Sequence, residues 1–365
     1  MIAAFRCDAS LEMGTGHVMR CLTLAQVLKA SGVQCHFICR DHPGNLIELV
    51  RTSGFVVHAL TRANSVEHSP ALAHAHWLGS SQDTDAQACC DILKHLGGNV
   101  SLIVDHYALD ARWESAMRSI CQRILVIDDL ADRTHDCDVL VDQTLGRHAS
   151  EYGGLLPDSC SRLCGSNFAL LRNEFLSWRA ASLQRRERSH ESHRILVSLG
   201  GVDMHNLTGG VLTALSRQRL PADCVITVVM GGAAPWVEQV RAVAEAMPVR
   251  TEVLVNVKNM AELMALSDLA IGAAGSTAWE RCCLGLPSFM FVLADNQQRI
   301  AQELVKAGAA LLLPREALDQ EDGLLPLVRF LASAQSLKAM SMKAHKLVDG
   351  LGTRRVADVF MCGLN

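Results

Sequence analysis

A histidine directly follows a glycine-rich turn near the start of the chain, where residues 14–17 read Gly-Thr-Gly-His. The apolar run at residues 2–5 predicts a β-strand before this turn, and residues 22–28 carry apolar side chains three and four positions apart, as in a helix. Such a turn presents free backbone N–H groups and the positive end of a helix dipole, which suits a phosphate. His17 would then reach the group attached to that phosphate. The alternative is an ordinary tight turn in which His17 has no role, because short glycine patterns also arise by chance.

A second turn of this kind occurs at residues 274–281, which read Ala-Gly-Ser-Thr-Ala-Trp-Glu-Arg. It follows a short predicted strand at residues 268–272, and Ser276 and Thr277 place hydroxyl groups where a helix would begin. Glu280 lies about one turn into that helix, where a carboxylate can accept two hydrogen bonds from a ribose diol. A capping box that begins at Thr277 would instead give Glu280 a structural role, and the sequence leaves both interpretations open.

A third glycine turn opens the second half of the chain. The apolar run at residues 194–199 leads into Gly200 and Gly201, and Asp203 precedes a helix expected from about Leu207. No sequence repeat relates the two halves, but the order of strand, glycine turn and helix is the same in both. Two halves that each offer a helix N-terminus suit a diphosphate.

The first motif resembles a known enzyme family, together with other stretches at residues 6–10, 77–82, 105–114 and 128–138. These segments are similar to the nucleotide-sugar hydrolases of pseudaminic acid biosynthesis, which remove UDP from UDP-2,4-diacetamido-2,4,6-trideoxy-β-L-altrose. In that family the histidine of the Gly-Thr-Gly-His motif is the proposed catalytic base, and the resemblance gives this role to His17. The wider relatives are GT-B glycosyltransferases, including the peptidoglycan N-acetylglucosaminyltransferase.

The resemblance also implies a nucleotide site in the second half. Residues 274–281 are similar to the uridine-nucleotide segment of GT-B enzymes, whose matching glutamate holds the ribose, and this points to Glu280. It places Asn296 and Gln297 at the same crevice, where their amides would bind phosphate or sugar; capping the helix at residues 299–307 is an equal alternative. With His17 as the catalytic residue, the predicted substrate-binding residues are Gly14, Thr15, Gly16, Arg20, Asp105, His106, Tyr107, Gly200, Gly201, Asp203, Gly275, Ser276, Thr277, Glu280, Asn296 and Gln297.

Polar side chains gather where the predicted strands of the first half end. Any one of these residues is readily explained as a helix cap or a turn residue. As a set they predict a polar wall at the carboxyl edge of a parallel sheet, where ligands bind in open α/β folds, and the resemblance implies that this wall holds the amino-sugar. The set consists of Asp8, Asp105, His106, Tyr107, Asp128, Asp129, Asp142 and Gln143.

Strands that alternate with helices throughout predict an α/β protein with parallel sheets. With the resemblance, the expected fold is GT-B: two Rossmann-like domains whose parallel sheets face a central crevice. We expect a first domain at residues 1–178, an exposed linker at 179–193, a UDP-binding domain at 194–350, and a C-terminal helix at 351–365 that crosses back to the first domain. The loop at residues 61–76 matches nothing in the family.

Composition narrows the partners of this 365-residue chain. The net charge is −4 without a long basic block, so nucleic acid is not an expected partner. No signal peptide and no membrane span is expected, and the 14 cysteines suit a reducing cytoplasm. Cysteine pairs at CxxxC spacing lack a second zinc-binding half, so we expect no metal and no cofactor. The expected partner is a small UDP-amino-sugar, and the expected state is a monomer or weak homodimer.

UDP that leaves an anomeric carbon is a stable anion, so its departure needs charge stabilisation more than a proton donor. A histidine kept neutral at a helix N-terminus could activate water for attack at C1 with inversion, without a metal. Three functions compete: this hydrolase, a GT-B glycosyltransferase that passes the sugar to an acceptor, and a non-catalytic nucleotide-sugar binding module. Retention of configuration would instead require a carboxylate nucleophile such as Asp105 or Asp128.

Overall fold

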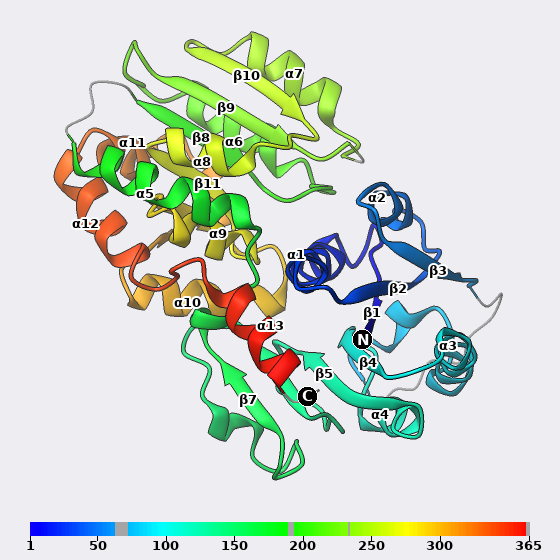
Figure 1. Ribbon diagram of the computed structural model, residues 1–365. Helices are drawn as coiled ribbons and strands as arrows, with labels where there is room; N and C mark the ends of the chain where they lie inside the picture. Colours follow the sequence, from blue (N-terminus) through cyan, green and yellow to red (C-terminus); the bar gives the residue numbers. More distant parts are fainter. Residues whose placement is uncertain (63–71, 189–192, 233, 363–365) are drawn as a thin grey trace. The chain divides into compact units, whose positions relative to one another are not determined.

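The computed structural model describes residues 1–62, 72–188, 193–232 and 234–362. The chain divides into two compact units (Figure 1). The first is formed by Met1–Leu170 with Leu351–Asn365, and the second by Leu171–Gly350. Each unit has one parallel sheet flanked by helices, which confirms the expected α/β class and its two Rossmann-like domains.

The first unit contains a seven-stranded sheet in the order β3-β2-β1-β4-β5-β6-β7, with every neighbouring pair parallel. Its central strands are continuous buried runs, as expected for a sheet covered on both faces. The register pairs Cys7, the last residue of β1, with Asp105, the last residue of β4, so the segments after both strands leave the same edge of the sheet. The strands are β1 Ile2–Cys7, β2 Gln34–Arg40, β3 Val56–Leu60, β4 Val100–Asp105, β5 Cys121–Ile127, β6 Val139–Asp142 and β7 Ser161–Cys164.

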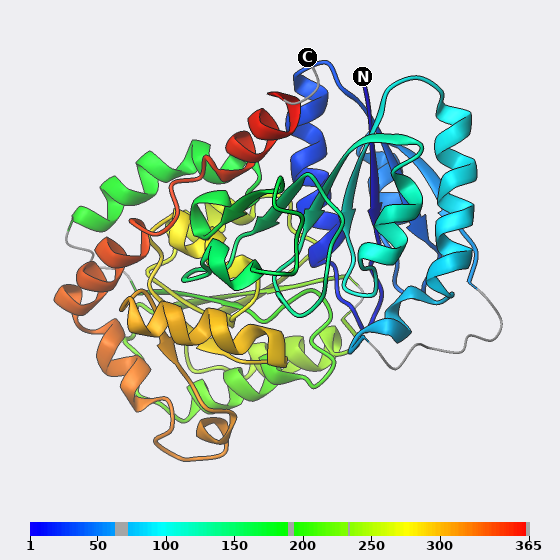
Figure 2. The same cartoon turned by 90° about the horizontal axis from the view of Figure 1, so that it is seen from below.

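The C-terminal helix α13 belongs to this first unit, where it lies beside α1 (Figure 2). Val356, Ala357 and Phe360 of α13 are fully buried in the same apolar cluster as Leu24 of α1. Gly352 opens the helix against the backbone of residue 169, whose carbonyl oxygen would lie 2.4 Å from an added Cβ. The helices of this unit are α1 Gly16–Ala30, α2 Ile47–Thr52, α3 Gln82–Leu96, α4 Ala111–Met117 and α13 Gly352–Cys362, with short 3-10 turns η1 Ala75–Leu78, η2 Ala149–Tyr152 and η3 Ser166–Phe168.

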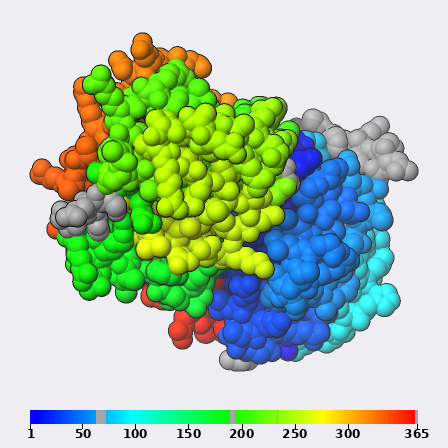
Figure 3. All heavy atoms as spheres, turned by 90° about the horizontal axis from the view of Figure 1, so that it is seen from above, coloured from blue at the N-terminus to red at the C-terminus, as the bar shows by residue number. Residues whose placement is uncertain are grey.

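The second unit contains a six-stranded parallel sheet in the order β10-β9-β8-β11-β12-β13. The segment from β9 to β10, coloured yellow-green, forms one face of this unit in the space-filling view (Figure 3). The strands are β8 Arg194–Ser198, β9 Val225–Met230, β10 Arg250–Val255, β11 Leu269–Ala273, β12 Ser288–Phe291 and β13 Leu311–Leu312. The helices are α5 Asn173–Glu187, α6 Leu207–Ser216, α7 Val237–Glu245, α8 Met260–Leu266, α9 Thr277–Cys283, α10 Gln298–Lys306, α11 Leu325–Leu331 and α12 Ala334–Ala344, with short 3-10 turns η4 Asp295–Gln297 and η5 Arg315–Leu318.

The expectation of an exposed linker at residues 179–193 is wrong, because helix α5 runs through its first nine positions and packs against the second unit. The hydroxyl of Ser182 donates to the carbonyl of Leu284, and the buried guanidinium of Arg186 donates to the carbonyls of Met264, Ser267 and Leu284. This helix therefore buries polar side chains by bonding them to backbone carbonyls. The scarcity of apolar residues in this segment, on which the expectation rested, does not reveal contacts of this kind. The boundary between the two units falls between Leu170 and Leu171 instead.

Parts of three expected segments lie outside the described residues: positions 63–71 of the unmatched loop, 189–192 of the expected linker and 363–365 of the C-terminal segment. Among the residues that the structure describes, no helix is long and apolar enough to cross a membrane.

Candidate active site

The turn before α1 is built around Gly14, whose φ of +76° lies in the left-handed region that glycine tolerates best. The backbone N–H of Gly14 donates to the carbonyl of Ser10 at 2.9 Å, which folds the turn back on itself. Thr15 occupies the N-cap position of α1, but its side chain makes no capping hydrogen bond, and the first turn of the helix contains no acidic residue. The side chain of Thr15 therefore does not take up the N–H groups that open α1, and N–H groups in this position are able to bind an anion.

His17 is bonded to a carboxylate that arrives from another strand. Its Nδ1 lies 2.6 Å from Oδ1 of Asp105, at the end of β4, and the imidazole is only 7% exposed. Burial raises the pKa of Asp105, but Arg20 and His17 outweigh it and hold this pKa well below its usual range. An ionised carboxylate can only accept, so Nδ1 of His17 donates to Asp105, and a neutral tautomer of this ring would carry its lone pair on Nε2. Within the described residues Nε2 has no hydrogen-bond partner, so this nitrogen is available for a further hydrogen bond.

Arg20 completes this arrangement one turn further along α1. Its Nε and Nη2 donate to the two oxygens of Asp105 at 2.6 and 2.7 Å, and its Nη1 donates to Asp129. The hydroxyl of Tyr107 donates to the same carboxylate of Asp129 at 3.0 Å, and the Tyr107 ring meets that of His17 edge-on, with centroids 4.6 Å apart. The structure thus brings together four predicted residues, His17, Arg20, Asp105 and Tyr107. Asp129, which sequence reasoning placed only in the polar wall, joins them.

Two of the predicted roles need correction. Asp105 is fully buried, with one oxygen on His17 and both on Arg20, so it positions the base and cannot touch substrate. His106 is buried as well: its Nε2 lies 3.2 Å from Asp8, and its Nδ1 accepts from the backbone N–H of Ala108 at 3.1 Å. Residues that end a strand alternate between the two faces of the sheet, so neighbours in sequence need not share a ligand.

Neither carboxylate considered as a nucleophile is accessible. Asp128 is fully buried, where it is paired with Arg133 at 2.7 Å and accepts from the hydroxyl of Tyr152 at 3.0 Å and from the backbone N–H of Ala131 at 2.9 Å. Asp105 is occupied as described above. A carboxylate that is fully bonded and closed to solvent cannot attack an anomeric carbon, so this geometry disfavours a covalent route through either residue.

In the second unit, the turn at Gly275 leads into α9. Ser276 is the N-cap and is exposed, but neither it nor the rest of the turn supplies a side-chain cap. Glu280 therefore does not form the capping box that was the structural alternative. Its carboxylate is 15% exposed and lies 3.5 Å from Arg172, a residue that sequence reasoning did not single out. Burial raises the pKa of Glu280, while Arg172 opposes that rise.

Gln297 is the N-cap residue of α10, but its side chain makes no capping hydrogen bond, and Asn296 precedes it in η4. The side-chain oxygen of Gln297 accepts from the backbone N–H of Leu293 at 3.0 Å. Its Nε2 would lie 3.7 Å from a Cβ added at Gly275, so the amide borders the glycine turn. Asn296 is exposed.

The third turn is different, and the predicted ligand role of Asp203 is wrong. The two carboxylate oxygens of Asp203 accept from the N–H groups of Leu207 and Thr208 at 2.9 and 2.8 Å, and the side chain of Asn206 accepts from Gly209 at 3.2 Å. The N-terminus of α6 is thus closed by the protein's own side chains. Gly200 and Gly201 remain exposed at the end of β8.

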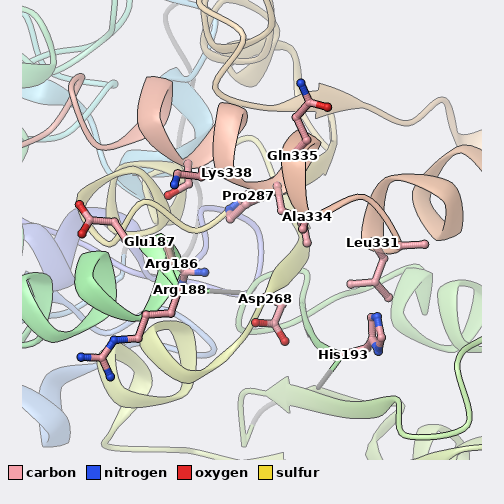
Figure 4. Close-up of a pocket in the computed structure, with 13 residues that line it drawn as sticks. Arg186, Glu187, Arg188, His193, Asp268, Pro287, Leu331, Ala334, Gln335 and Lys338 are labelled. Carbon is pink, nitrogen blue, oxygen red and sulfur yellow. The ribbon is translucent and has the colours of Figure 1, made fainter. Parts of the chain in front are cut away.

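Figure 4 shows residues that line a cavity of about 390 Å³ in the second unit. Three of the residues that line it immediately precede strands β8, β11 and β12: His193, Asp268 and Pro287. The glycine turns follow the carboxyl ends of β8 and β11, so this cavity belongs to the opposite edge of the sheet. It is not part of the candidate nucleotide site.

Comparison with known proteins fits this arrangement. Residues 195–352 match the glycosyltransferase family 28 C-terminal domain. Over 309 residues the chain is 25% identical to the UDP-2,4-diacetamido-2,4,6-trideoxy-beta-L-altropyranose hydrolase of Campylobacter jejuni, which covers 84% of this chain and 97% of that protein. This similarity confirms the resemblance drawn from the motifs.

Other relatives match at a similar identity or over a shorter stretch of the chain. The chain is 25% identical over 307 residues to an uncharacterized protein of Methanocaldococcus jannaschii, covering 82% of this chain but only 57% of that relative. It is 37% identical over 116 residues to the UDP-N-acetylglucosamine–N-acetylmuramyl-(pentapeptide) pyrophosphoryl-undecaprenol N-acetylglucosamine transferase of Ectopseudomonas mendocina, covering 30% of this chain and 33% of that protein.

Among solved structures, Acinetobacter baumannii MurG aligns with a TM-score of 0.71 at 19% identity, covering 98% of both chains. The fold is therefore GT-B, and the chain is related to enzymes that act on nucleotide sugars.

Proposed function

We propose that this protein is a hydrolase that removes UDP from UDP-2,4-diacetamido-2,4,6-trideoxy-β-L-altropyranose and releases the free sugar for pseudaminic acid biosynthesis. The observation that carries the proposal is the 2.6 Å contact between His17 and Asp105, which leaves Nε2 of His17 unpaired beside an uncapped helix N-terminus. Similarity to the Campylobacter hydrolase over most of both chains supports the same activity.

In the proposed reaction, Nε2 of His17 takes a proton from water while the water oxygen attacks C1 of the sugar. The bond between C1 and the phosphate oxygen breaks, and UDP leaves with the electron pair. The imidazolium that forms at His17 is stabilised by the ionised Asp105, as a carboxylate stabilises histidine in hydrolase triads. Because UDP is a good leaving group, no carboxylic acid is needed to protonate it.

The second unit is proposed to hold the nucleotide. The uncapped turn at Gly275, Ser276 and Thr277 would bind phosphate through backbone N–H groups. Glu280, free of a capping role, would accept from the ribose hydroxyls. Gln297, beside Gly275, would contribute its amide to the same nucleotide.

A glycosyltransferase is the second candidate, favoured by the family 28 match over residues 195–352. The two functions differ in the acceptor, which is water in one and a sugar or lipid hydroxyl in the other. The deciding experiment incubates the pure protein with UDP-2,4-diacetamido-2,4,6-trideoxy-β-L-altropyranose and no acceptor, and follows UDP release. We expect the enzyme to turn over many times and to release one UDP for each substrate molecule consumed. Release that requires an added acceptor would establish the transferase instead.

A further inference from the structure

Aromatic rings adjoin the candidate base, His17. The Tyr107 ring meets His17 edge-on at 4.6 Å between centroids, and the Trp77 ring lies 6.3 Å from His17 at an interplanar angle of 73°. Trp77 and Tyr107 stack at 5.9 Å, and His74 lies 4.3 Å from Trp77 and 5.6 Å from Tyr107. The three rings of His74, Trp77 and Tyr107, here called the aromatic wall, are therefore mutually in contact and adjoin His17.

The position of Trp77 is fixed by its neighbours in the chain. Leu78 is 1% exposed and packs into the core of the first unit, so the 3-10 turn η1 is anchored immediately after Trp77. Gly79, at φ +67°, approaches the ring of His42 so closely that a Cβ would lie 2.8 Å from its Cε1. A side chain held this way needs no rearrangement to receive a ligand, which lowers the entropic cost of binding.

The members of the aromatic wall differ in exposure. Tyr107 is buried, whereas Trp77 and His74 are partly exposed and so offer ring surface to a ligand. Burial lowers the pKa of His74, which favours the uncharged form of its ring. The aromatic wall therefore places apolar ring surface next to His17. A binding site for a hydroxyl-rich sugar would instead be expected to offer polar partners at this position.

We propose that Trp77, supported by His74, determines sugar specificity by stacking on the apolar parts of the substrate, its acetamido methyl groups and its C6 methyl group. This rests on the proposed function, because it assumes that the sugar binds next to His17. Indole and imidazole faces gain from burying methyl groups and gain nothing from hydroxyl groups, which would lose water without a hydrogen-bond partner. The aromatic wall should therefore favour acetamido, deoxy sugars over fully hydroxylated hexoses.

The test compares Trp77→Ala and Trp77→Phe with Trp178→Phe, a matched change on α5 in the second unit, outside the proposed machinery. The substrates are UDP-2,4-diacetamido-2,4,6-trideoxy-β-L-altropyranose and UDP-glucose. One missing methylene in an apolar pocket changes kcat/KM by about 10-fold or more. We expect Trp77→Ala to lower the preference for the diacetamido substrate by at least about 10-fold, mainly through KM, with Trp77→Phe intermediate and Trp178→Phe unchanged.

A second readout does not depend on turnover. Trp77 is one of five tryptophans, so its emission contributes to the protein's fluorescence. Free 2,4-diacetamido-2,4,6-trideoxy-altrose should change that emission, glucose at the same concentration should not, and Trp77→Phe should remove the response while Trp178→Phe keeps it.

The outcomes separate this inference from the proposed function. Equal losses on both substrates in Trp77→Ala, no loss on either, or a sugar response that survives in Trp77→Phe would each overturn the specificity role. A wild-type protein that releases no UDP, yet shows a sugar response that depends on Trp77, would overturn the hydrolase function and leave the aromatic wall intact. A wild-type protein that responds to neither sugar, and shows no preference between the two substrates, would refute the role of the aromatic wall outright.

Discussion

The carboxylate of Asp105 fixes the ring of His17 through a 2.6 Å contact to Nδ1, although the two residues lie 88 positions apart in the chain. Asp105 ends β4 and His17 begins the helix that follows β1, and the parallel pairing of these strands brings them to one edge of the sheet. Arg20 shares the same carboxylate and limits the movement of both. The base is therefore oriented by the sheet register, not by the glycine turn alone.

Asp105→Asn should lower kcat by about 10²- to 10⁴-fold. The amide keeps the shape of the side chain but can donate to Nδ1, which would move the proton to Nε2 and remove the lone pair that takes the proton from water; the same change in a hydrolase triad costs about 10⁴. Steady-state hydrolysis measures the effect, and calorimetry with UDP should show unchanged affinity.

The control for this change is Asp110→Asn, at a second buried aspartate of the first unit. Asp110 caps α4 by accepting from the N–H of Arg112, and asparagine caps helices equally well. Turnover should survive in this variant. Equal activity in both variants would show that Asp105 does not orient the base.

His17→Ala should abolish measurable turnover while UDP still binds, because His17 is proposed to contact water and not the diphosphate. General-base catalysis is typically worth about 10²- to 10⁴-fold. Calorimetry with UDP and hydrolysis of the diacetamido substrate are measured on the same preparation. Turnover close to that of the wild type would remove His17 from the mechanism.

Much of the fold followed from local patterns. The apolar runs at residues 2–5 and 194–199 identified strands β1 and β8, and glycine turns marked where helices begin. The short strand β7 was missed, since its four residues include Ser161 and Arg162 and no residue of it is fully buried. Helix α5 was missed because it is anchored by arginine and serine side chains that bond carbonyl oxygens, a contact with no apolar period.

The site was predictable in its residues but not in their roles. The motif identified His17, and the strand ends identified Asp105, yet sequence spacing does not tell which polar side chain faces a ligand and which faces another side chain. The sequence does not distinguish His106 and Asp203 from polar residues that face a ligand, but the first pairs with Asp8 and the second caps α6. Trp77 comes from a turn whose position depends on packing of Leu78, which no local pattern records.

Gly231→Ala should disturb the Gly200–Gly201 turn. A Cβ at residue 231 would lie 2.1 Å from the carbonyl oxygen of Gly201, so the backbone must move. We expect a loss of about 1–3 kcal/mol in the free energy of unfolding, typical of a forced contact. The matched control is Gly210→Ala inside α6, where the nearest atom is 3.4 Å away and alanine should stabilise by about 0.5–1 kcal/mol. Urea unfolding of both variants measures the two effects, and equal stabilities would contradict the contact.

Acid should remove a stabilising contribution from Asp128. Burial raises the pKa of this carboxyl, but Arg133 and other partners outweigh it and bring the pKa to about 2. A carboxyl whose pKa is lowered on folding stabilises the protein above its unfolded pKa of about 4, and that stabilisation is lost as the pH falls toward 2. The shift corresponds to about 2 kcal/mol.

The measurement compares wild type with Asp128→Asn, which cannot titrate. The difference in their free energies of unfolding should be constant from pH 7 to 5 and shrink by about 2 kcal/mol between pH 4 and 2. A difference that stays the same through this range would show that Asp128 is not held ionised by Arg133.

The last prediction concerns which bond breaks. Water attack at C1 puts solvent oxygen into the sugar, whereas attack at the β-phosphorus puts it into UDP. Phosphoryl transfer usually relies on a cation clamp around the phosphoryl oxygens. His17 carries its free Nε2 beside the aromatic wall, which suits a sugar, and its Nδ1 is committed to Asp105. In ¹⁸O-labelled water we therefore expect label in the sugar and none in UDP.

The same experiment also determines the anomeric configuration of the released sugar at C1. A single displacement by water inverts the anomeric centre, and a covalent intermediate retains it. Both carboxylates that could have formed such an intermediate, Asp105 and Asp128, are fully buried, and each is paired with an arginine. The first-formed anomer, read by NMR before mutarotation, should thus be opposite to that of the substrate. Label in the sugar with retained configuration would require a nucleophile other than these two, and label in UDP would leave His17 without the role proposed for it.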